Sequence, residues 1–313
     1  VVTGTLRGAP LRVGDELVAM PGGASLRVRG LHVHDHAVTE VHAPARVAVN
    51  VVGDRVDGLA RGHVLARAGE LAMSALIDVE LERLGPVPGT RPEVWPRRRQ
   101  VVVAHGTTHV PAELVLLGDG PLAQLRPRGG LAVVPGDRFV LLGAQRSLHR
   151  GRTIGGGRVV RPHAVRARGP AGLATATMFA SGGARLGHEL ALAANAGRTD
   201  AELVLRLGVT TSVATTMIAA VLASGEARRC GDRVLASAAA AALEALVMAR
   251  LPAPLASLRS ALSASVHPRV GDAIVDGLRA RGAIVVETAT GLARLAGAVP
   301  VVDPLEATLR ARF

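Results

Sequence analysis

The first part of the chain consists of short alternating segments that break at Gly, Pro or Asp, and this pattern limits the fold more than any other feature. Thr3–Arg7 and Leu11–Leu17 alternate in polarity, and a Gly8–Pro10 turn joins them. Alternation with a period of two places successive side chains on opposite faces of a strand. Because these segments lack a helical period, the pattern predicts a small β-barrel over residues 1–70.

A second all-β region is predicted over residues 71–162. Between its first two strands lies a Pro-rich connection that contains Arg97, Arg98 and Arg99. We expect a surface loop there, because proline donates no ladder hydrogen bond. The segments that read as strands are Ala75–Leu81, Gln100–His105, Glu113–Leu117 and Asp137–Leu142.

The hydrophobic period changes after Pro162. Thr199–Gly208 begins with Thr/Asp capping residues and ends at glycine, and a second Ala-rich helix is predicted over Thr211–Ser224. Arg228–Leu235 follows as a hairpin-like segment. Two helices followed by a hairpin are typical of a winged helix, which we predict over residues 163–236.

The same order repeats further along the chain. Gly225 follows the last predicted helix of the first module, and Gly282 follows the last predicted helix of the second. This repetition predicts a second winged helix over residues 237–297, and residues 298–313 as the start of a further, truncated module. In this second module we predict helices over Ala238–Leu251, Leu255–Ala264 and Arg269–Arg281, followed by a hairpin over Ala283–Leu295.

Composition bounds the class of protein. The chain has 313 residues, of which 49% are hydrophobic, so several small globular domains with real cores are expected. Its formal charge of +12 favours a polyanionic partner, although the dominance of Ala, Val, Leu, Arg and Gly is also what a compositional bias produces. The single cysteine, Cys230, excludes an internal disulfide and suits a reducing cytosol.

Several strings resemble one family. The opening segments look like the second domain of translational GTPases of the elongation factor Tu type, and three further strings narrow the resemblance to the selenocysteine-specific elongation factors. The resemblance implies a multidomain chain of two translation-factor-type β-barrels followed by two α+β winged-helix modules. The three strings are Leu26–His34, Ala45–Gly53 and Arg61–Ala66.

The resemblance implies that the complete protein binds selenocysteyl-tRNA and delivers it to a ribosome at recoded UGA codons. It uses GTP and Mg²⁺, and it contacts an mRNA hairpin through C-terminal modules that we expect to be missing here. Its G domain precedes the position of Val1, so we expect this chain to be a fragment that lacks it. No lysine occurs in the sequence, which excludes the P-loop lysine and the guanine-reading Asn-Lys-x-Asp motif. We therefore expect no GTPase activity, no catalytic residues and no cofactor in this chain, and a cytoplasmic protein without a membrane segment.

Arg46 is the most specific candidate for a binding residue. In the family, the corresponding arginine lies in the pocket for the esterified amino acid. A selenol is more acidic than a thiol, whose pKa is about 8.5, and a guanidinium that stays charged would favour the selenolate. The local sequence Pro44-Ala45 departs from the family pattern, and a solvated arginine at a strand edge is the alternative.

Arg152, Arg158 and His105 are further candidates for contact with aminoacyl-tRNA. The two arginines flank Gly155–Gly157 in a stretch that matches the end of the family's third domain. Such a glycine-rich stretch favours a structural turn over a nucleotide loop, because no helix follows it. His105 belongs to a segment of the family's third domain, and a structural role is its alternative.

The winged-helix region offers weaker candidates for RNA contact. Thr211 lies at the start of the second helix of the first module, and Arg228 and Arg229 lie at its hairpin. Hydroxyl and guanidinium groups at those places suit phosphate contacts. Helix capping by threonine and simple solvation of arginine explain the same residues.

His32, His34 and His36 alternate along a predicted strand and would therefore face one side. That spacing can chelate a metal, but no fourth ligand is evident, so a solvent-facing strand is favoured and no metal site is predicted.

Two other functions remain open at this point. A winged-helix DNA-binding regulator with β-barrel sensory domains would explain the second half of the chain but not the translation-factor strings in residues 1–66. A fragment of a general elongation factor would explain the barrels but not the helical modules.

Overall fold

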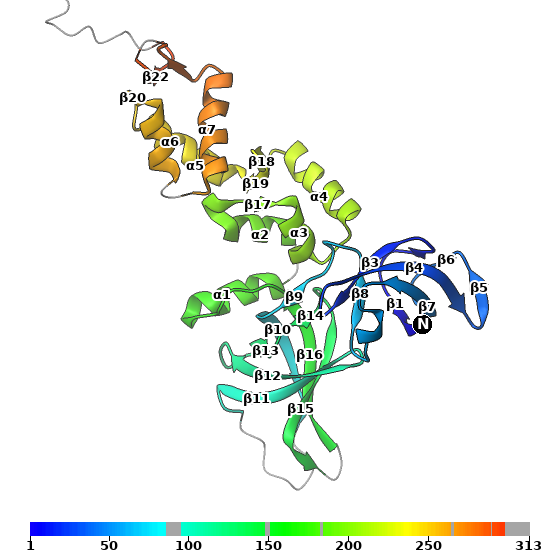
Figure 1. Ribbon diagram of the computed structural model, residues 1–313. Coiled ribbons are helices and arrows are strands. Elements are labelled where there is room, and N and C mark those ends of the chain that lie inside the picture. Colours follow the sequence, from blue (N-terminus) through cyan, green and yellow to red (C-terminus); the bar gives the residue numbers. More distant parts are fainter. Residues whose placement is uncertain (86–94, 148–150, 182–183, 264–265, 289, 298–313) are drawn as a thin grey trace, which may run out of the picture. The chain divides into compact units, whose positions relative to one another are not determined.

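The computed structural model describes residues 1–85, 95–147, 151–181, 184–263, 266–288 and 290–297 (Figure 1). The chain divides into two compact units. The first contains Val1–Glu189 and Asp200–Ile218, and the second contains Leu190–Thr199 and Ala219–Phe313.

The predicted first barrel region folds into a six-stranded antiparallel sheet of the β-barrel type. Along β7, Val47, Val49 and Val51 are buried, whereas Arg46 and Asn50 are exposed, as period-two alternation requires. The hydrogen-bonded order is β1 (Val2–Leu6), β7 (Ala45–Gly53), β4 (Ala24–Val33), β3 (Glu16–Met20) and β8 (Val64–Ala66), with β5 (His36–Val38) paired to β4. Beside it lie a small sheet of β2 (Leu11–Arg12) and β6 (Glu40–Val41), and the 3-10 turn η1 (Val56–Gly58).

The histidines of this region do not alternate along one strand. His34 and Asp35 have φ angles of 49° and 63° and form a tight turn between β4 and β5. Two consecutive residues with positive φ reverse the chain, so Val33 pairs directly with His36. The prediction that His32, His34 and His36 share one face of a strand is therefore wrong. In the described part of the chain, no group of three or more His, Cys, Asp or Glu residues is placed to hold a metal ion.

The second region forms a closed six-stranded barrel, shown in cyan and green in Figure 1. Its core contains Ile77, Val79, Val103, Leu125 and Leu141, all at most 1% exposed. The strand order is β10 (Ile77–Arg83), β13 (Leu122–Pro127), β12 (Thr108–Leu116), β11 (Arg98–His105), β15 (Arg138–Ser147) and β16 (Gly151–Arg161). A two-stranded sheet of β9 (Met73–Ser74) and β14 (Leu131–Ala132) accompanies it.

Two local predictions for this barrel are corrected. Arg98 and Arg99 belong to β11 and not to a surface loop, because the strand continues past the Pro-rich connection to pair with β12. The glycine-rich stretch is not a turn but part of β16. A Cβ atom on Gly157 would lie 2.1 Å from the carbonyl oxygen of Glu80, so the glycines let neighbouring strands approach closely.

The helical region begins with α1 (Gly169–Ala180), which the sequence did not indicate and which packs on the barrel against β10, β13 and β16. After α1, the chain passes two times through the same series of elements, which is helix, strand, helix, helix, strand and strand. The first round is α2 (Arg185–Ala193), β17 (Arg198–Thr199), α3 (Asp200–Leu207), α4 (Thr211–Ala223), β18 (Ala227–Cys230) and β19 (Arg233–Ala236), with the 3-10 turn η2 (Ala194–Ala196) after α2. The second is α5 (Ser237–Met248), β20 (Ala253–Pro254), α6 (Leu255–Ser263), α7 (Pro268–Ala280), β21 (Ile284–Val286) and β22 (Leu292–Leu295).

The two rounds share sheet topology and chain reversals. The sheets have the orders β17-β19-β18 and β20-β22-β21, which are equivalent positions in each round. Gly225 and Gly282 follow α4 and α7 with φ angles of 77° and 69°, the left-handed conformation that glycine adopts most easily. The predicted equivalence of these two glycines is confirmed.

In the second compact unit, the β18–β19 hairpin shares one hydrophobic core with α5 and α7. Cys230 and Leu235 of the hairpin belong to the same buried cluster as Leu243, Val270 and Ile274 of the helices. Burial raises the pKa of the Cys230 thiol, so this cysteine behaves as a core residue.

Among the described residues, no single helix is both long and apolar enough to cross a membrane. The pair α3 and α4 meets the length and composition requirement only together, with a bend of 111° between them.

Candidate functional site

Arg46 lies on the outer face of the first sheet. It is exposed, stands opposite Thr5 in the β1–β7 register, and donates a hydrogen bond from Nη1 to Thr5 Oγ1 at 3.2 Å. A hydroxyl carries no charge, so this contact orients the guanidinium without neutralising it. Arg46 can therefore meet an anion on this face through charge-assisted hydrogen bonds.

The residues around Arg46 are small or polar. Thr3 pairs with Ala48 on one side, and His32 pairs with Ala48 on the other. Asn50 follows two residues further along the same face of β7. Thr3, His32 and Asn50 are exposed like Arg46 itself, so Arg46 lies on a solvent-facing surface of the sheet.

His105 lies in a different place, at the end of β11. Its Nε2 is 3.2 Å from Asp137 Oδ2, and the two side chains are 10% and 4% exposed. Asp137 also accepts a hydrogen bond from the Val134 amide at 3.0 Å and pairs with Arg7 Nη2 at 2.8 Å. Arg7 follows β1, so Asp137 ties the first sheet to the barrel. Contact between His105 and RNA would require the imidazole to leave this carboxylate.

Asp137 is held ionised by its partners. Burial alone would raise the pKa of its carboxyl, but the hydrogen bond from His105, the bond from the Val134 amide and the charges of His105 and Arg7 outweigh burial and lower the pKa. The carboxylate therefore keeps its charge at neutral pH, and the position of His105 is structural in this conformation.

Arg152 and Arg158 both lie on β16, but each is bonded within the barrel region. Arg152 Nε donates to the carbonyl oxygen of Gly143 at 2.8 Å. Arg158 Nε donates to Glu80 Oε2 at 2.6 Å, and its Nη2 donates to the Ala180 carbonyl at the end of α1 at 3.1 Å. The Arg158 side chain remains 40% exposed, so it can take one further partner.

The glycine-rich stretch between these arginines does not fit a nucleotide phosphate. Gly155 and Gly156 pair with β10 and β15 on both sides, which commits this backbone to the barrel ladder. A phosphate loop needs several amides directed at one point and a following helix. The residues present therefore give no site for GTP in β16.

Thr211 begins α4, whereas Arg228 and Arg229 both lie on β18. The Thr211 amide at the start of α4 donates to Glu70 Oε1 at 3.0 Å, so a carboxylate of the same compact unit caps this helix. Arg228 Nη2 donates to Glu244 Oε1 at 2.7 Å. Arg229, the next residue on β18, is exposed.

Sequence reasoning missed a cluster at one end of the barrel. Trp95, the only tryptophan in the sequence, lies under two guanidinium groups, with Arg83 Cζ and Arg99 Cζ each 5.2 Å from the ring centroid. Arg83 Nη2 also donates to the Gly120 carbonyl at 3.3 Å. The rarity of aromatic residues in this chain was the signal that could have drawn attention to Trp95.

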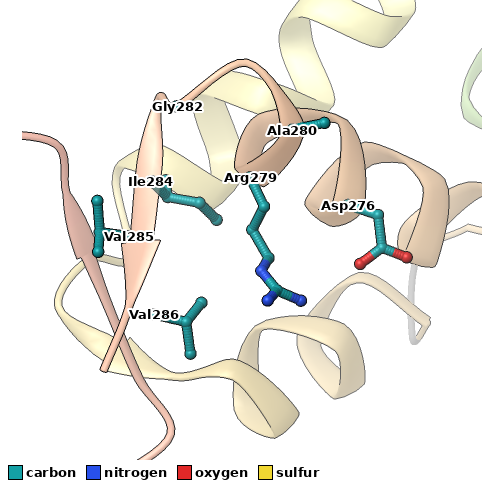
Figure 2. A pocket seen from close by; sticks show the side chains of 7 residues that line it. All are labelled: Asp276, Arg279, Ala280, Gly282, Ile284, Val285 and Val286. Atoms are coloured by element: carbon teal, nitrogen blue, oxygen red, sulfur yellow. The ribbon is translucent and has the colours of Figure 1, made fainter. Parts of the chain in front are cut away.

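A groove of about 620 Å³ lies between α7 and the edge strand β21 (Figure 2). The side chain of Arg279 extends along it, toward Val286. Asp276 on the same helix already accepts a hydrogen bond from Arg259 Nη2 at 2.7 Å. The groove is open and mixes apolar with charged walls, and no sequence motif marks it.

The comparisons with known proteins agree on one family. Residues 95–166, which include five strands of the closed barrel (β11, β12, β13, β15 and β16), match the model of the selenocysteine-specific elongation factor β-barrel domain. The selenocysteine-specific elongation factor of Desulfomicrobium baculatum is 36% identical over 169 residues, covering 52% of this chain and 25% of the relative. That of Escherichia coli strain K12 is 30% identical over 161 residues, covering 51% of this chain and 24% of the relative.

The fold agrees with a solved structure as well. The crystal structure of a bacterial selenocysteine-specific elongation factor, EF-Sec, matches 94% of this chain and 46% of its own chain with a TM-score of 0.65 at 17% identity. This chain thus spans about a quarter of the length of the curated relatives that it matches. The predicted resemblance to selenocysteine-specific elongation factors is confirmed, and the matches lie outside the GTP-binding region of those proteins.

Proposed function

We propose that this chain supplies the part of a selenocysteine-specific elongation factor that holds selenocysteyl-tRNA during delivery to the ribosome at recoded UGA codons. The observation that carries the proposal is the match of residues 95–166, which contain five strands of the closed barrel, to the β-barrel domain of that family. Two selenocysteine-specific elongation factors are also 36% and 30% identical over about half of this chain. This match also favours the elongation factor over a winged-helix DNA-binding regulator with sensory barrels.

In this proposal the two β-barrel regions bind the aminoacyl-tRNA, and the helical modules act as a spacer. We assign residues 1–70 and 71–162 to elongation factor domains II and III, residues 163–236 and 237–297 to two winged helices, and residues 298–313 to the start of a further module. The repeated helix, strand, helix, helix, strand, strand order supports the winged-helix assignment. The ribosome and an mRNA hairpin would be contacted by the complete assembly, in the cytoplasm.

GTP hydrolysis belongs to a G domain outside this sequence in our proposal. The sequence contains no lysine, and a P-loop uses one to reach the β- and γ-phosphates. GTP and Mg²⁺ would therefore act on the complete protein, and this chain would have no catalytic residue of its own.

Arg46 is the proposed contact for the esterified selenocysteine. The selenolate is an anion at neutral pH, whereas the serine hydroxyl is not, because a selenol is more acidic than a thiol with its pKa of about 8.5. The exposed guanidinium on β7, whose hydrogen-bond partner is the neutral Thr5 hydroxyl, supports this role. Arg152 and Arg158 are proposed as secondary contacts with the tRNA, and Thr211, Arg228 and Arg229 as weaker RNA contacts. His105 would join the secondary contacts only in a conformation in which its imidazole leaves Asp137.

A domain exchange tests the proposal. Residues 1–166 of this chain would replace the aligned region of the Escherichia coli relative, and the chimera would be expressed in cells that lack their own factor. We expect it to bind selenocysteyl-tRNA and to restore selenocysteine insertion at an in-frame UGA codon of a reporter.

The control is the GTPase activity of the chimera, which the exchange leaves untouched. A chimera that is folded, hydrolyses GTP and still fails to bind selenocysteyl-tRNA would show that these barrels do not carry that function. Tight binding of duplex DNA by the whole chain would instead support the regulator.

A further inference from the structure

A buried ion pair joins the last strand of the barrel to the helical region. Arg161 ends β16 and is 2% exposed, and Glu189 on α2 is 1% exposed. Arg161 Nε donates to Glu189 Oε1 at 2.8 Å, and Nη2 donates to Oε2 at 3.3 Å. This bidentate geometry is the strongest that arginine and a carboxylate form.

Two further groups complete the pair. The guanidinium of Arg161 lies over the ring of Phe179 on α1, with Cζ 4.8 Å from the centroid. Arg206 on α3 approaches Glu189 Oε2 at 3.5 Å and donates from Nη1 to the carbonyl oxygen of His163 at 3.1 Å. Three helices thus converge on one strand end through charge and cation–π contacts.

Other arginines cross the same boundary in both directions. Arg158 reaches from β16 to the Ala180 carbonyl of α1 at 3.1 Å, and Arg185 reaches from α2 to the Val160 carbonyl of β16 at 2.6 Å. Gly208, which follows α3, lies so close to the barrel region that a Cβ there would be 2.4 Å from Pro135 Cδ. The boundary is therefore continuous from α1 to the end of α3.

Separating these helices from the barrel would leave charges in an apolar setting. A buried charge that loses its partner keeps its desolvation penalty without the compensating attraction. Movement of α2 away from β16 is therefore opposed by more than the loss of packing. Consistent with this, Val1–Glu189 and Asp200–Ile218 belong to one compact unit.

We propose that Arg161 and Glu189 form a latch that makes α1, the beginning of α2 and α3 mechanically part of the barrel, so that a displacement of these helices acts directly on strand β16. Arg161 and Glu189 are positioning residues, and Arg206 reinforces the latch from its rim. The proposal rests on the contacts alone and does not depend on the proposed role in selenocysteine insertion.

Hydrogen exchange followed by mass spectrometry on the whole chain tests the latch. In the unsubstituted protein, we expect the amides of α2 to open about as rarely as those of β16. In Glu189→Gln, we expect α2 to exchange about tenfold faster or more while β10 and β13 keep their protection, because only the helix loses its anchor. Arg12→Gln, which removes the exposed Arg12–Glu40 pair, is the matched control and should change neither region.

Arg206→Gln provides a second, milder variant in case Glu189→Gln fails to fold. Its side chain is 17% exposed and meets Glu189 at the longer distance, so α2 should loosen in the same direction but less. The proposal is wrong if α2 of the unsubstituted protein exchanges much faster than β16. It is also wrong if the folded variants leave α2 unchanged, or if they loosen the barrel strands and α2 to the same degree.

Discussion

Two arginines at the ends of β-strands illustrate how differently one residue type is used in this molecule. Arg46 stands on the open face of the first sheet with a neutral threonine as its hydrogen-bond partner. Arg161 closes the last strand of the barrel and is bonded by two nitrogens to a buried glutamate. The exposed arginine is free to serve a ligand at little cost to folding, whereas the buried one is committed to the structure.

The largest effect on folding is expected from Arg161→Ala. Removing one partner of a buried ion pair leaves Glu189 charged and without its main contact, which costs about 3–5 kcal/mol. Urea unfolding of the whole chain measures the loss. Arg98→Ala is the matched control. The Arg98 side chain is 64% exposed, and its Nη1 lies 3.5 Å from Glu113 Oε1, which is a long distance for an ion pair. Exposed pairs of this kind contribute about 0–1 kcal/mol to stability. Equal losses for the two variants would contradict the distinction between buried and exposed arginines.

Asp78→Asn is expected to stabilise the protein at neutral pH. Asp78 pairs with Arg161 in the β10–β16 register and accepts a hydrogen bond from Gln124 Nε2 at 2.9 Å. Burial raises the pKa of Asp78 from 3.8 to about 6, against the opposing effects of Gln124 and Arg161. A raised pKa means that the folded state loses stability as the pH rises from about 4 to about 6.

The asparagine removes this penalty, so the variant should gain about 1–3 kcal/mol above pH 6 relative to the unsubstituted protein and almost nothing at pH 4. Unfolding curves across this pH range measure the difference. If Asp78→Asn instead lowered the stability at pH 7, the negative charge of Asp78 would be needed to stabilise Arg161. Asp78 would then belong to the latch together with Arg161 and Glu189.

His105→Ala should have a smaller cost of about 1–2 kcal/mol at pH 7, because it removes a hydrogen bond to a buried carboxylate. The pKa of Asp137 lies below its ordinary value, so the stability that Asp137 contributes is present at neutral pH and is lost as the pH falls through that lowered pKa. The difference between the variant and the unsubstituted protein should therefore shrink in acid.

His109→Ala serves as the control for His105, since His109 is an exposed histidine on the neighbouring strand. Thermal unfolding at pH 7 and pH 3 distinguishes the two. A His105→Ala variant that unfolds like His109→Ala would indicate that the bond to Asp137 does not stabilise the junction between the first sheet and the barrel.

The smallest effect on stability is expected from Arg46→Ala, within about 0.5 kcal/mol, because surface substitutions rarely exceed that. Its effect should be on binding. With the G domain and GTP supplied, the variant should bind selenocysteyl-tRNA about ten- to a hundredfold more weakly, and seryl-tRNA on the same tRNA body much less so.

Arg29→Ala is the control for Arg46, because Arg29 is exposed on β4 of the same sheet. Filter binding with the two charged tRNAs gives both affinities. Equal losses for the two esterified residues would assign Arg46 to the tRNA backbone, since backbone contacts do not distinguish the amino acid.

Much of the architecture could be predicted from the local pattern of polar and apolar residues in the sequence. Period-two alternation in residues 1–70 and 71–162 predicted two all-β regions, and the capping residues and glycines placed α3, α4 and the following hairpin within a few residues of their observed bounds. α1 and α2 were missed. α1 is Ala-rich and has almost no amphipathic period, so its sequence gives little helical signal. α2 has a clear amphipathic period, but it is only nine residues long and the sequence analysis assigned no element there.

The sequence by itself determined that two all-β regions precede the helical region, that no P-loop lysine is present, and that the family strings occur, because each of these features depends only on residues close together in the chain. Only the tertiary structure decided that the glycine-rich stretch is a strand, that His105 faces Asp137, and that Arg161 meets Glu189. Those outcomes depend on which distant segments become neighbours. A charge at the end of a strand reads the same in sequence whether it faces water, as Arg46 does, or a buried carboxylate, as Arg161 does, and only burial separates the two.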